Sequence, residues 1–456
     1  LRFVLNIAFL RRNIPARINN LFLHENLNKK RKPIGVLFGG ETAEKQVSLM
    51  SGTNAWLKLR GSLSYKPYPY LLAKKNEIWE LPYSYILNHT VEEIIANAEN
   101  APRDIQRLFF LIQKVKIKLF LQKSDATENF FMPQKHTLDK IFKKHPFIFL
   151  ALHGGVGEDG TIQRILEKNK IKYNGSDSFT SKLCLDKWLT NEIISQANFK
   201  GVKTASHVLL KVKDLSKLSL NKTKEIYWVM LLKTLGGKTI IAKPRGDGCS
   251  AGVVRLFNQK DLSTYVSFIK NKYPTVNPGS FTNQRSVIQM PEGKVTFVIF
   301  ETFIETDKLK ILGDKIAHLR KSGFVEMTVG VVEDKGRMRS LSPSITVAEE
   351  TILSVEEKFQ GGTGVNITPP PTEIISRKNL NKVKRSVELV AQKLGIRGYA
   401  RIDIFTQVKT GNIIVIEVNT LPGLTPSTVI YHQALAEKKS MFPKEFLELI
   451  IKNKES

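Results

Sequence analysis

The stretch VIEVNTLPG, residues 415–423, places a carboxylate and an amide two positions apart in an apolar strand that ends in a Pro-Gly turn. Side chains two positions apart on a strand point the same way, so Glu417 and Asn419 are expected to face one spot. Burying both without partners costs free energy, and a hard cation such as Mg²⁺ removes that cost because it prefers oxygen ligands. A half-exposed strand whose polar face meets water is the alternative for this stretch alone.

The strand before it, GYARIDIF at residues 398–405, repeats the pattern with Arg401 and Asp403. A short hairpin joins the two strands, so the carboxylates of Asp403 and Glu417 and the amide of Asn419 are expected on one face. Arg401 adds a guanidinium that can neutralise negative charge developing in a transition state. The two strands together favour a magnesium–nucleotide site, and buried ion pairing between Arg401 and the carboxylates is the structural alternative.

A glycine-rich loop follows another apolar strand in IIAKPRGDGCSAGV, residues 240–253. Lys243 stands at the end of that strand, and the backbone N–H groups of the loop that contains Ser250 can close over a polyphosphate. The spacing is not that of a P-loop. A glycine-rich hairpin with an exposed lysine would show the same pattern.

Two strand–turn–helix units precede this loop. In PIGVLFGGETAEKQVSLMSG, residues 33–52, Thr42 and Glu44 open a helix whose N-terminal N–H groups can meet an anion. In FIFLALHGGVGEDGTIQRILE, residues 147–167, His153 follows an apolar strand, and Glu158 and Asp159 have the pattern of helix caps. Strands that alternate with helices in this way predict an α/β protein with a parallel sheet.

Length and composition indicate a soluble globular protein of two or three domains, with 456 residues of which 42% are apolar and 25% charged. Two cysteines in so long a chain fit a reducing compartment, and we expect a cytoplasmic protein. The net charge of +28 is spread along the chain without any nucleic-acid-binding motif, so we expect no nucleic-acid partner. Residues 1–32 are basic and amphipathic, and their apolar run is too short to span a bilayer. We expect them to be a poorly ordered extension or a surface helix without stable membrane insertion, and membrane association is the alternative.

The rest of the chain gives coarser signals. Residues 60–145 carry no usable motif, residues 226–304 have the pattern of a strand-rich region, and a helix is expected at about 378–394.

Taken together, these segments resemble the D-alanine:D-alanine ligase family of ATP-grasp enzymes. The resemblance runs in the family's order from residue 33 to about 430, and residues 1–32 and 60–145 fall outside it. The matching pieces are GVLFGGETAEKQVSLMSG, LHGGVGEDGTIQRILEKNKIKYNGS, CLDKW, IIAKPRGDGCSAGV, GYARIDIF and IEVNTLPGLTPST.

The resemblance implies a three-domain ATP-grasp architecture, α/β with an N-terminal parallel-sheet domain and α+β in the ATP-grasp part. We expect an N-terminal α/β substrate domain at 33–175 with an insertion near 60–145. A central ATP-grasp domain is expected at 176–304. A C-terminal ATP-grasp domain with the metal site and an active-site loop is expected at 305–456.

It also implies an ATP-dependent ligase that joins two D-alanines for peptidoglycan precursors. ATP phosphorylates the carboxylate of the first D-alanine, and the amine of the second attacks the acyl phosphate. By similarity, Glu44 takes the ammonium group of the first D-alanine and His153 lies near its carboxylate. Lys187 and Lys243 contact the ATP phosphates, beneath the loop that contains Ser250.

For the remaining parts of the site, the resemblance implies that Arg401 and the Gly423 N–H form the oxyanion hole. Glu301 and Ile304 contact adenine, and Glu326 reaches the ribose across an apparent insertion at 306–323. The implied ligands of Mg²⁺, or Mn²⁺, are Asp403, Glu417 and Asn419.

The chain departs from the family at two positions. Cys249 stands where the family usually has a serine, and Phe359 stands where it has a tyrosine, so the hydrogen bonds that these hydroxyls make to the glutamate at the Glu44 position are lost. Lys358 beside it is expected to meet the γ-phosphate or the second substrate, whose carboxylate Thr428 is expected to bind. In ligases of this type a phenylalanine in the loop goes with use of D-lactate, so we hypothesise altered specificity at the second site.

Two other functions stay open at this point. The chain can be an ATP-grasp ligase for a different carboxylate–amine pair, including D-alanine with D-lactate, or an ATP-binding homologue that has lost ligation. Retention of both lysines and of Arg401 argues against the non-catalytic homologue, since binding alone does not require an oxyanion arginine. A homodimer is implied only by the resemblance.

Overall fold

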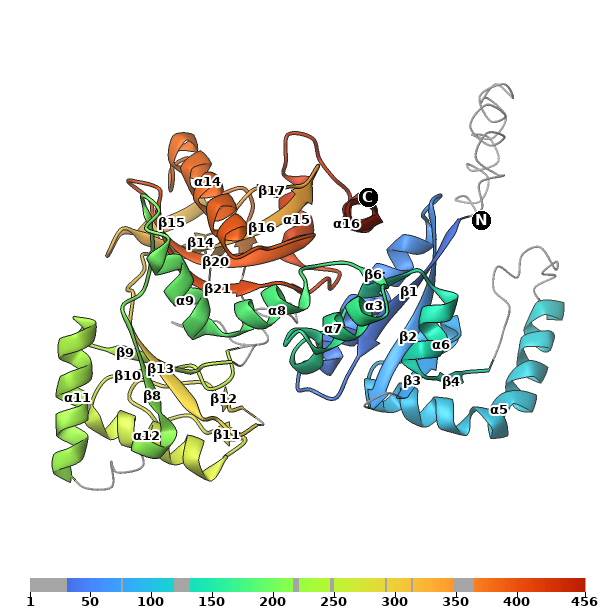
Figure 1. Cartoon of the computed structure of the whole chain (residues 1–456), viewed down its shortest axis with the longest axis horizontal. Helices are drawn as coiled ribbons and strands as arrows, with labels where there is room; N and C mark the ends of the chain where they lie inside the picture. Colours follow the sequence, from blue (N-terminus) through green and yellow to red (C-terminus); the bar gives the residue numbers. More distant parts are fainter. Residues whose placement is uncertain are drawn as a thin grey trace.

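A computed structural model of the chain describes residues 31–74, 77–118, 132–215, 221–246, 250–291, 293–312, 315–347 and 365–455. The extension expected over residues 1–32 lies almost wholly outside these ranges. Three larger sheets, each with its own helices, follow one another along the described chain (Figure 1). Parallel and antiparallel strands are both present, which confirms the mixed α/β class.

The first sheet, drawn in blue in Figure 1, has the strand order β4-β3-β2-β1-β5-β6. β1 pairs in parallel with β2 and β5, β5 pairs in parallel with β6, and β3 and β4 continue the sheet antiparallel. Its strands are β1 (Lys32–Gly39), β2 (Tyr65–Lys74), β3 (Glu77–Glu80), β4 (Gln134–His136), β5 (Phe147–Leu150) and β6 (Lys172–Tyr173). Its helical elements are α3 (Lys45–Arg60), α4 (Tyr83–Ile86), α5 (Val91–Lys118), α6 (Leu138–Lys144), η2 (Gly155–Gly157) and α7 (Thr161–Lys168).

Three of these strands, β2 to β4, come from the segment expected as an insertion near 60–145. β2 pairs along its whole length with β1, so this part of the segment belongs to the sheet itself. Between β3 and β4 the chain forms α4 and α5; α4 and the start of α5 share the core of this sheet, with Ile86, Val91 and Ile94 buried in it. Figure 1 shows α5 at the edge of this part of the molecule.

The second sheet has the order β10-β9-β13-β8 and is antiparallel throughout. The strand-rich pattern expected for 226–304 is incomplete, because α11 and α12 pack their apolar faces on this sheet. The strands are β8 (His207–Lys211), β9 (Ile240–Pro244), β10 (Val254–Leu256) and β13 (Phe297–Thr302), with a separate pair, β11 (Thr275–Val276) and β12 (Ile288–Gln289). The helices are α10 (Val212–Leu215), α11 (Asn221–Leu235) and α12 (Gln259–Asn271).

The third sheet follows the order β19-β18-β16-β20-β21-β7, with β17 paired to β16. Its strands are β7 (Val202–Thr204), β16 (Phe324–Asp334), β17 (Arg337–Ser340), β18 (Ser344–Val347), β19 (Val365–Ile367), β20 (Tyr399–Gln407) and β21 (Asn412–Asn419). Its helices are α8 (Ser178–Leu185), α9 (Lys187–Gln196) and α14 (Arg377–Lys393). Leu183 of α8, Ile194 of α9 and Val202 share one core with Val387 of α14. Residues 178–204 therefore pack with the C-terminal sheet, although they precede the second sheet in sequence.

The residues at 306–323 form a hairpin of β14 (Lys308–Leu312) and β15 (Lys315–Leu319). Asp307 fixes the base of this hairpin, because its carboxylate accepts hydrogen bonds from the backbone N–H groups of Lys321, Ser322 and Gly323. The hairpin therefore separates β13 from β16 without disturbing either strand.

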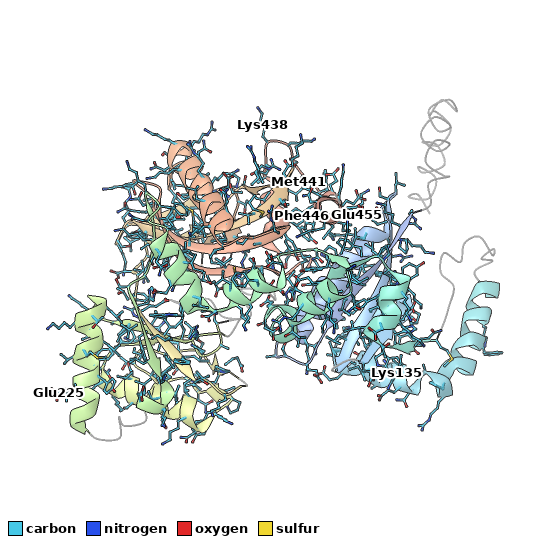
Figure 2. All side chains as sticks on the ribbon, in the orientation of Figure 1. Lys135, Glu225, Lys438, Met441, Phe446 and Glu455 are labelled. Atoms are coloured by element: carbon cyan, nitrogen blue, oxygen red, sulfur yellow. The ribbon has the colours of Figure 1, made fainter. Side chains whose placement is uncertain are left out.

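The last two helices, α15 (Val429–Leu435) and α16 (Pro443–Glu455), join the first and third parts of the molecule. Figure 2 labels Phe446 and Glu455 of α16 where the helix lies between the blue and orange sheets. The Phe446 ring meets Tyr399 of β20 and Tyr431 of α15 edge-on, at 6.2 and 5.9 Å between ring centroids. Glu455 pairs with Lys32 of β1 at 2.8 Å. One continuous apolar core therefore runs from the N-terminal sheet to the C-terminal helices.

Candidate active site

The polar face predicted for the last two strands is present in the third sheet. Asp403 lies directly opposite Glu417, and Arg401 lies opposite Asn419. The Arg401 guanidinium donates from Nε and Nη2 to the two carboxylate oxygens of Asp403, at 3.1 and 2.9 Å, and lies 3.9 Å from Glu417. The ion pairing that was the structural alternative is thus observed, and it holds these groups together on one face.

A β-bulge sets the direction of these side chains. Asp403 pairs with Glu417 but Ile404 pairs with Val415, so Ile416 is an extra residue on β21. The bulge lets Val415 point into the core while Glu417 points to the polar face. Simple alternation along the strand would have put Val415 and Glu417 on the same side.

Strand β16 extends this face. Thr328 lies opposite Asp403 and donates a hydrogen bond from Oγ1 to its carboxylate at 2.6 Å. Glu326 stands two residues before Thr328 on the same strand, so it shares the face. The candidate ribose contact and the candidate metal ligands are therefore on one surface.

The candidate ATP residues of the second sheet form a buried pair. Lys243 of β9 and Glu301 of β13 make an ion pair of 2.8 Å, with side chains only 5% and 10% exposed. Asn191 of α9 donates to the other Glu301 oxygen at 3.0 Å. Ile304 follows in the segment after β13, half-buried. The pair thus ties the second sheet to a helix that packs on the third.

Lys187 is placed by the residues on either side of the helix start. Asp186 caps α9 by accepting from the Leu189 N–H at 3.1 Å, and its carboxylate also pairs with Arg245 at 2.7 Å. The Lys187 N–H donates to the Arg245 carbonyl at 3.0 Å. Because Arg245 follows Lys243 by two residues, these bonds bring the two predicted phosphate lysines to the same region.

The two strand–turn–helix units place Glu44 beside His153. β1 and β5 are parallel neighbours, so the loops after their carboxyl ends lie at one edge of the sheet. A Cβ on Gly154 would lie 3.3 Å from Glu44 Oε1, and Gly154 has a φ of +66°. The backbone conformation therefore favours glycine there, and the short distance shows that the Glu44 carboxylate lies against this loop. Thr42 donates to the His153 carbonyl at 3.1 Å, which joins the two loops.

The turn after β21 reaches back to this edge. Ser51 Oγ of α3 lies 2.8 Å from His153 Nε2 and accepts from the Leu424 N–H at 3.0 Å. Thr428 donates to the Gly423 carbonyl at 2.6 Å, so its hydroxyl proton is already used within the turn. The predicted oxyanion amide at Gly423 is therefore close to the predicted first-substrate residues.

A small cavity joins the parts of the site. Its lining includes Glu158 of the second strand–turn–helix unit, Lys187 of α9, and Glu417 and Asn419 of β21. The full lining is Glu158, Ser181, Cys184, Leu185, Lys187, Glu417, Val418, Asn419 and Thr420. Glu158 thus lines the site. Asp159 accepts from the N–H of Thr161, the first residue of α7, at 2.8 Å, although the N-cap position itself is Gly160.

Two sequence models of one family match the chain. The D-ala D-ala ligase N-terminus matches residues 33–176, and the D-ala D-ala ligase C-terminus matches residues 319–452. The chain belongs to the D-alanine–D-alanine ligase family. The first match includes residues 60–145, in agreement with the strands that this segment adds to the N-terminal sheet.

Known D-alanine–D-alanine ligases match nearly the whole chain. The enzyme of Pediococcus pentosaceus is 27% identical over 88% of this chain and 92% of its own length. That of Leptospira interrogans is 27% identical over 90% and 94%. Among solved structures, the VanG D-Ala:D-Ser ligase of Enterococcus faecalis has a TM-score of 0.60 at 18% identity, covering 93% of this chain and 99% of that one. The ATP complex of the Bacillus anthracis ligase has a TM-score of 0.53 at 20% identity, covering 93% and 97%.

Several ligase residues predicted from the sequence fall at or beyond the edge of the described structure. Cys249, Lys358 and Phe359 lie outside the described residues. Ser250, at the end of the glycine-rich loop, is described and has a φ of +60°. The hydrogen bonds that Cys249 and Phe359 are expected to lack are therefore not tested by the geometry.

Sequence reasoning missed the side chains that support the site. Asp186, Asn191, Thr328 and Ser51 make the contacts above, yet each is an isolated polar residue without a spacing signal. Asp186 is the exception, because it stands in the CLDKW segment just before an expected helix, and an aspartate there is a common N-cap.

Proposed function

We propose that this protein joins two D-alanines into D-alanyl-D-alanine with hydrolysis of ATP to ADP and phosphate. The observation that carries the proposal is the shared face of Arg401, Asp403 and Glu417, with the Gly423 turn beside it. A binding protein would not need a guanidinium held in a fixed fork by a carboxylate beside this turn.

In the first step, the protein holds a carboxylate against the γ-phosphate of ATP. Lys243 and Lys187 supply positive charge to the phosphates, and the buried Lys243–Glu301 pair keeps the lysine oriented before ATP arrives. Glu44 takes the substrate ammonium and His153 lies near the carboxylate. The role of these residues is mainly positioning and charge neutralisation.

In the second step, the amine of another D-alanine attacks the carbonyl carbon of the acyl phosphate, and negative charge develops on the carbonyl oxygen. Arg401 and the Gly423 N–H stabilise that charge, because both are donors fixed before the reaction begins. Thr428 stands at the start of α15, and its hydroxyl would have to release the Gly423 carbonyl in order to donate to the carboxylate of the second substrate.

The donor set fits a magnesium ion, or Mn²⁺. Asp403 and Glu417 face each other across adjacent strands, and Asn419 brings an amide to the same face. The described residues hold no cluster of three or more His, Cys, Asp or Glu suited to a metal, so these two carboxylates would need the phosphates of ATP to complete the coordination. Bound there, the metal would supply charge screening of the phosphates.

We further propose that the second site accepts D-lactate as well as D-alanine. Phe359 replaces a family tyrosine in the loop, and without that hydroxyl the second site loses one hydrogen bond. A hydroxyl nucleophile then competes with the amine, and it competes best at mildly acidic pH, where the amine is protonated.

The test is to incubate the purified protein with ATP, Mg²⁺ and D-alanine, with and without D-lactate, and to identify products by mass spectrometry. Dipeptide with stoichiometric phosphate is the expected result, and depsipeptide is expected when D-lactate is present. Dipeptide alone at neutral and mildly acidic pH would remove the D-lactate proposal. ATP binding without either product would remove the ligase proposal and favour another carboxylate–amine pair or a non-catalytic homologue.

The division into domains at 33–175, 176–304 and 305–456, and the homodimer, are proposals that rest on the resemblance to the family. Residues 178–204, which the second of these domains would include, pack with the third sheet. Limited proteolysis tests the domain boundaries, and sedimentation tests the homodimer. Within the described residues, no helix is long and apolar enough to cross a membrane.

A further inference from the structure

Helix α3 binds both backbone polar groups of Leu424, the residue that follows Gly423 and its predicted oxyanion N–H. Ser51 accepts from the Leu424 N–H at 3.0 Å, and Asn54 donates to the Leu424 carbonyl at 2.7 Å. Ser51 and Asn54 are three positions apart, so they lie on one face of α3. Ser51 is fully buried, and Asn54 and Leu424 are almost so, so water cannot replace these bonds.

The neighbouring Gly423 N–H is left free by the same arrangement. The Gly423 carbonyl accepts from Thr428, and the N–H and carbonyl of Leu424 are both hydrogen-bonded. The Gly423 N–H makes no hydrogen bond to any residue in the described ranges. Gly423 is itself a buried residue. A buried N–H without an acceptor is rare in proteins, and here the bonds around it fix its direction.

Ser51 also connects the turn after β21 to His153, which is expected beside the first substrate. Its hydroxyl accepts from Leu424 and therefore has its proton available for His153 Nε2, 2.8 Å away. The other ring nitrogen of His153 lies 3.9 Å from Glu158. One hydroxyl thus joins the imidazole expected beside the first substrate to the turn expected beside the oxyanion.

We propose that Ser51 and Asn54 are positioning residues for the second step of the reaction: they hold the Leu424 peptide so that the free Gly423 N–H points at the developing oxyanion. The inference rests on the proposed function. It predicts that loss of the Asn54 side chain harms attack on the acyl phosphate more than formation of the acyl phosphate, because phosphoryl transfer makes no use of the Gly423 N–H. Loss of the Ser51 hydroxyl also removes the contact to His153, so Ser51→Ala is expected to slow both steps, and the second step more than the first.

The variants that test this are Ser51→Ala, which removes the acceptor, and Asn54→Asp, which keeps the acceptor for Lys58 but removes the donor to Leu424. The matched control is Thr53→Val on the same helix. The Thr53 hydroxyl is buried and has no hydrogen-bond partner among the described residues, and valine keeps its shape. Because the two variants each remove a different hydrogen bond to Leu424, the test remains decisive if one of them folds poorly.

Two rates are measured for each protein. Dipeptide formation reports the whole reaction. D-alanine-dependent scrambling of ¹⁸O between the βγ-bridge and the β non-bridge positions of labelled ATP reports the first step and its reversal. Scrambling requires that ADP forms, that its β-phosphate rotates, and that the acyl phosphate returns its phosphoryl group.

For Ser51→Ala and Asn54→Asp we expect the ratio of scrambling to ligation to rise about tenfold or more, since misplacing an oxyanion donor is costly. Thr53→Val should keep the ratio of the unmodified protein. A merely structural role would lower both rates by the same factor and leave the ratio unchanged, which would overturn the inference. An equal rise in Thr53→Val would also overturn it. Absence of both activities in the unmodified protein would instead refute the proposed function, and the inference with it.

Discussion

At the scale of single residues, the site depends on side chains whose partners limit what they can do. Arg401 is fixed by Asp403, so its guanidinium has one orientation towards the polar face. Cys184 also lines the cavity, but it is unsuited to act as a nucleophile. Burial raises the pKa of its thiol to about 12 and keeps it neutral. Arg401 is therefore a candidate for chemistry and Cys184 is not.

Replacement of Arg401 by lysine tests this difference. Lysine keeps the charge but cannot make the two-pronged contact with Asp403, so we expect kcat for ligation to fall by about 10²- to 10³-fold. The affinity for ATP, measured by titration calorimetry, should change little. The control is Arg397→Lys, since Arg397 pairs with Glu333 at 3.1 Å and is half exposed, away from the polar face. Equal losses in the two variants would contradict the assigned role.

At the scale of elements, the bulge in β21 decides which residues of VIEVN reach the site. With Ile416 as an extra residue, Val415 packs in the core and Glu417 faces Asp403. Removing Ile416 would make Val415 and Glu417 neighbours, so the pairs Ile404–Val415 and Asp403–Glu417 would follow each other in a regular ladder and each side chain would keep its face.

We expect the Ile416 deletion variant to stay folded and to keep ligation, because Glu417 still faces Asp403 and Asn419 still faces Arg401 once the extra residue is gone. Ile416→Val is the matched control, because it keeps the bulge and removes one methyl group, at a cost of about 1 kcal/mol. Circular dichroism melting and product formation measure folding and activity. Loss of ligation in a deletion variant that stayed folded would contradict this pairing of the two strands.

The elements also show how far the sequence could lead. Spacing in GYARIDIF and VIEVN was enough to predict that Arg401, Asp403, Glu417 and Asn419 share a face, because local periodicity carries that information. It could not reveal the bulge, since Ile416 has the same composition signal as any strand residue. Nor could it reveal Ser51, whose partners are 102 and 373 residues away along the chain. Contacts of that kind depend on how the sheets pack and not on local pattern.

At the scale of the whole molecule, the N-terminal sheet holds a buried histidine outside the site. His145 is 2% exposed, and its Nε2 lies 2.7 Å from the Tyr70 hydroxyl. Burial lowers its pKa to about 4 from an ordinary value near 6.5, although Glu80 works in the opposite direction. The folded protein therefore keeps His145 neutral at pH values where the unfolded chain protonates it.

This difference makes the free energy of unfolding depend on pH. Between pH 6.5 and 4 the unfolded state binds the additional proton, so the stability that is complete above pH 6.5 is lost as the pH falls, by at most about 3 kcal/mol. In His145→Phe the pH dependence of denaturant unfolding over this range should flatten. His89→Phe is the control, because the His89 side chain is 92% exposed. An unchanged slope in His145→Phe would contradict the assignment.

In the proposed reaction the protein first activates the carboxylate of one D-alanine as an acyl phosphate and then joins it to the amine of another. In that sequence the departing phosphate keeps one oxygen of the carboxylate, because the bond that breaks is between the carbonyl carbon and that oxygen. The most direct measurement therefore uses D-alanine labelled with ¹⁸O in its carboxylate, together with ATP and Mg²⁺, and follows phosphate and dipeptide by mass spectrometry. We predict one ¹⁸O in each released phosphate for each dipeptide formed. Unlabelled phosphate, or ATP hydrolysis without dipeptide, would contradict the account.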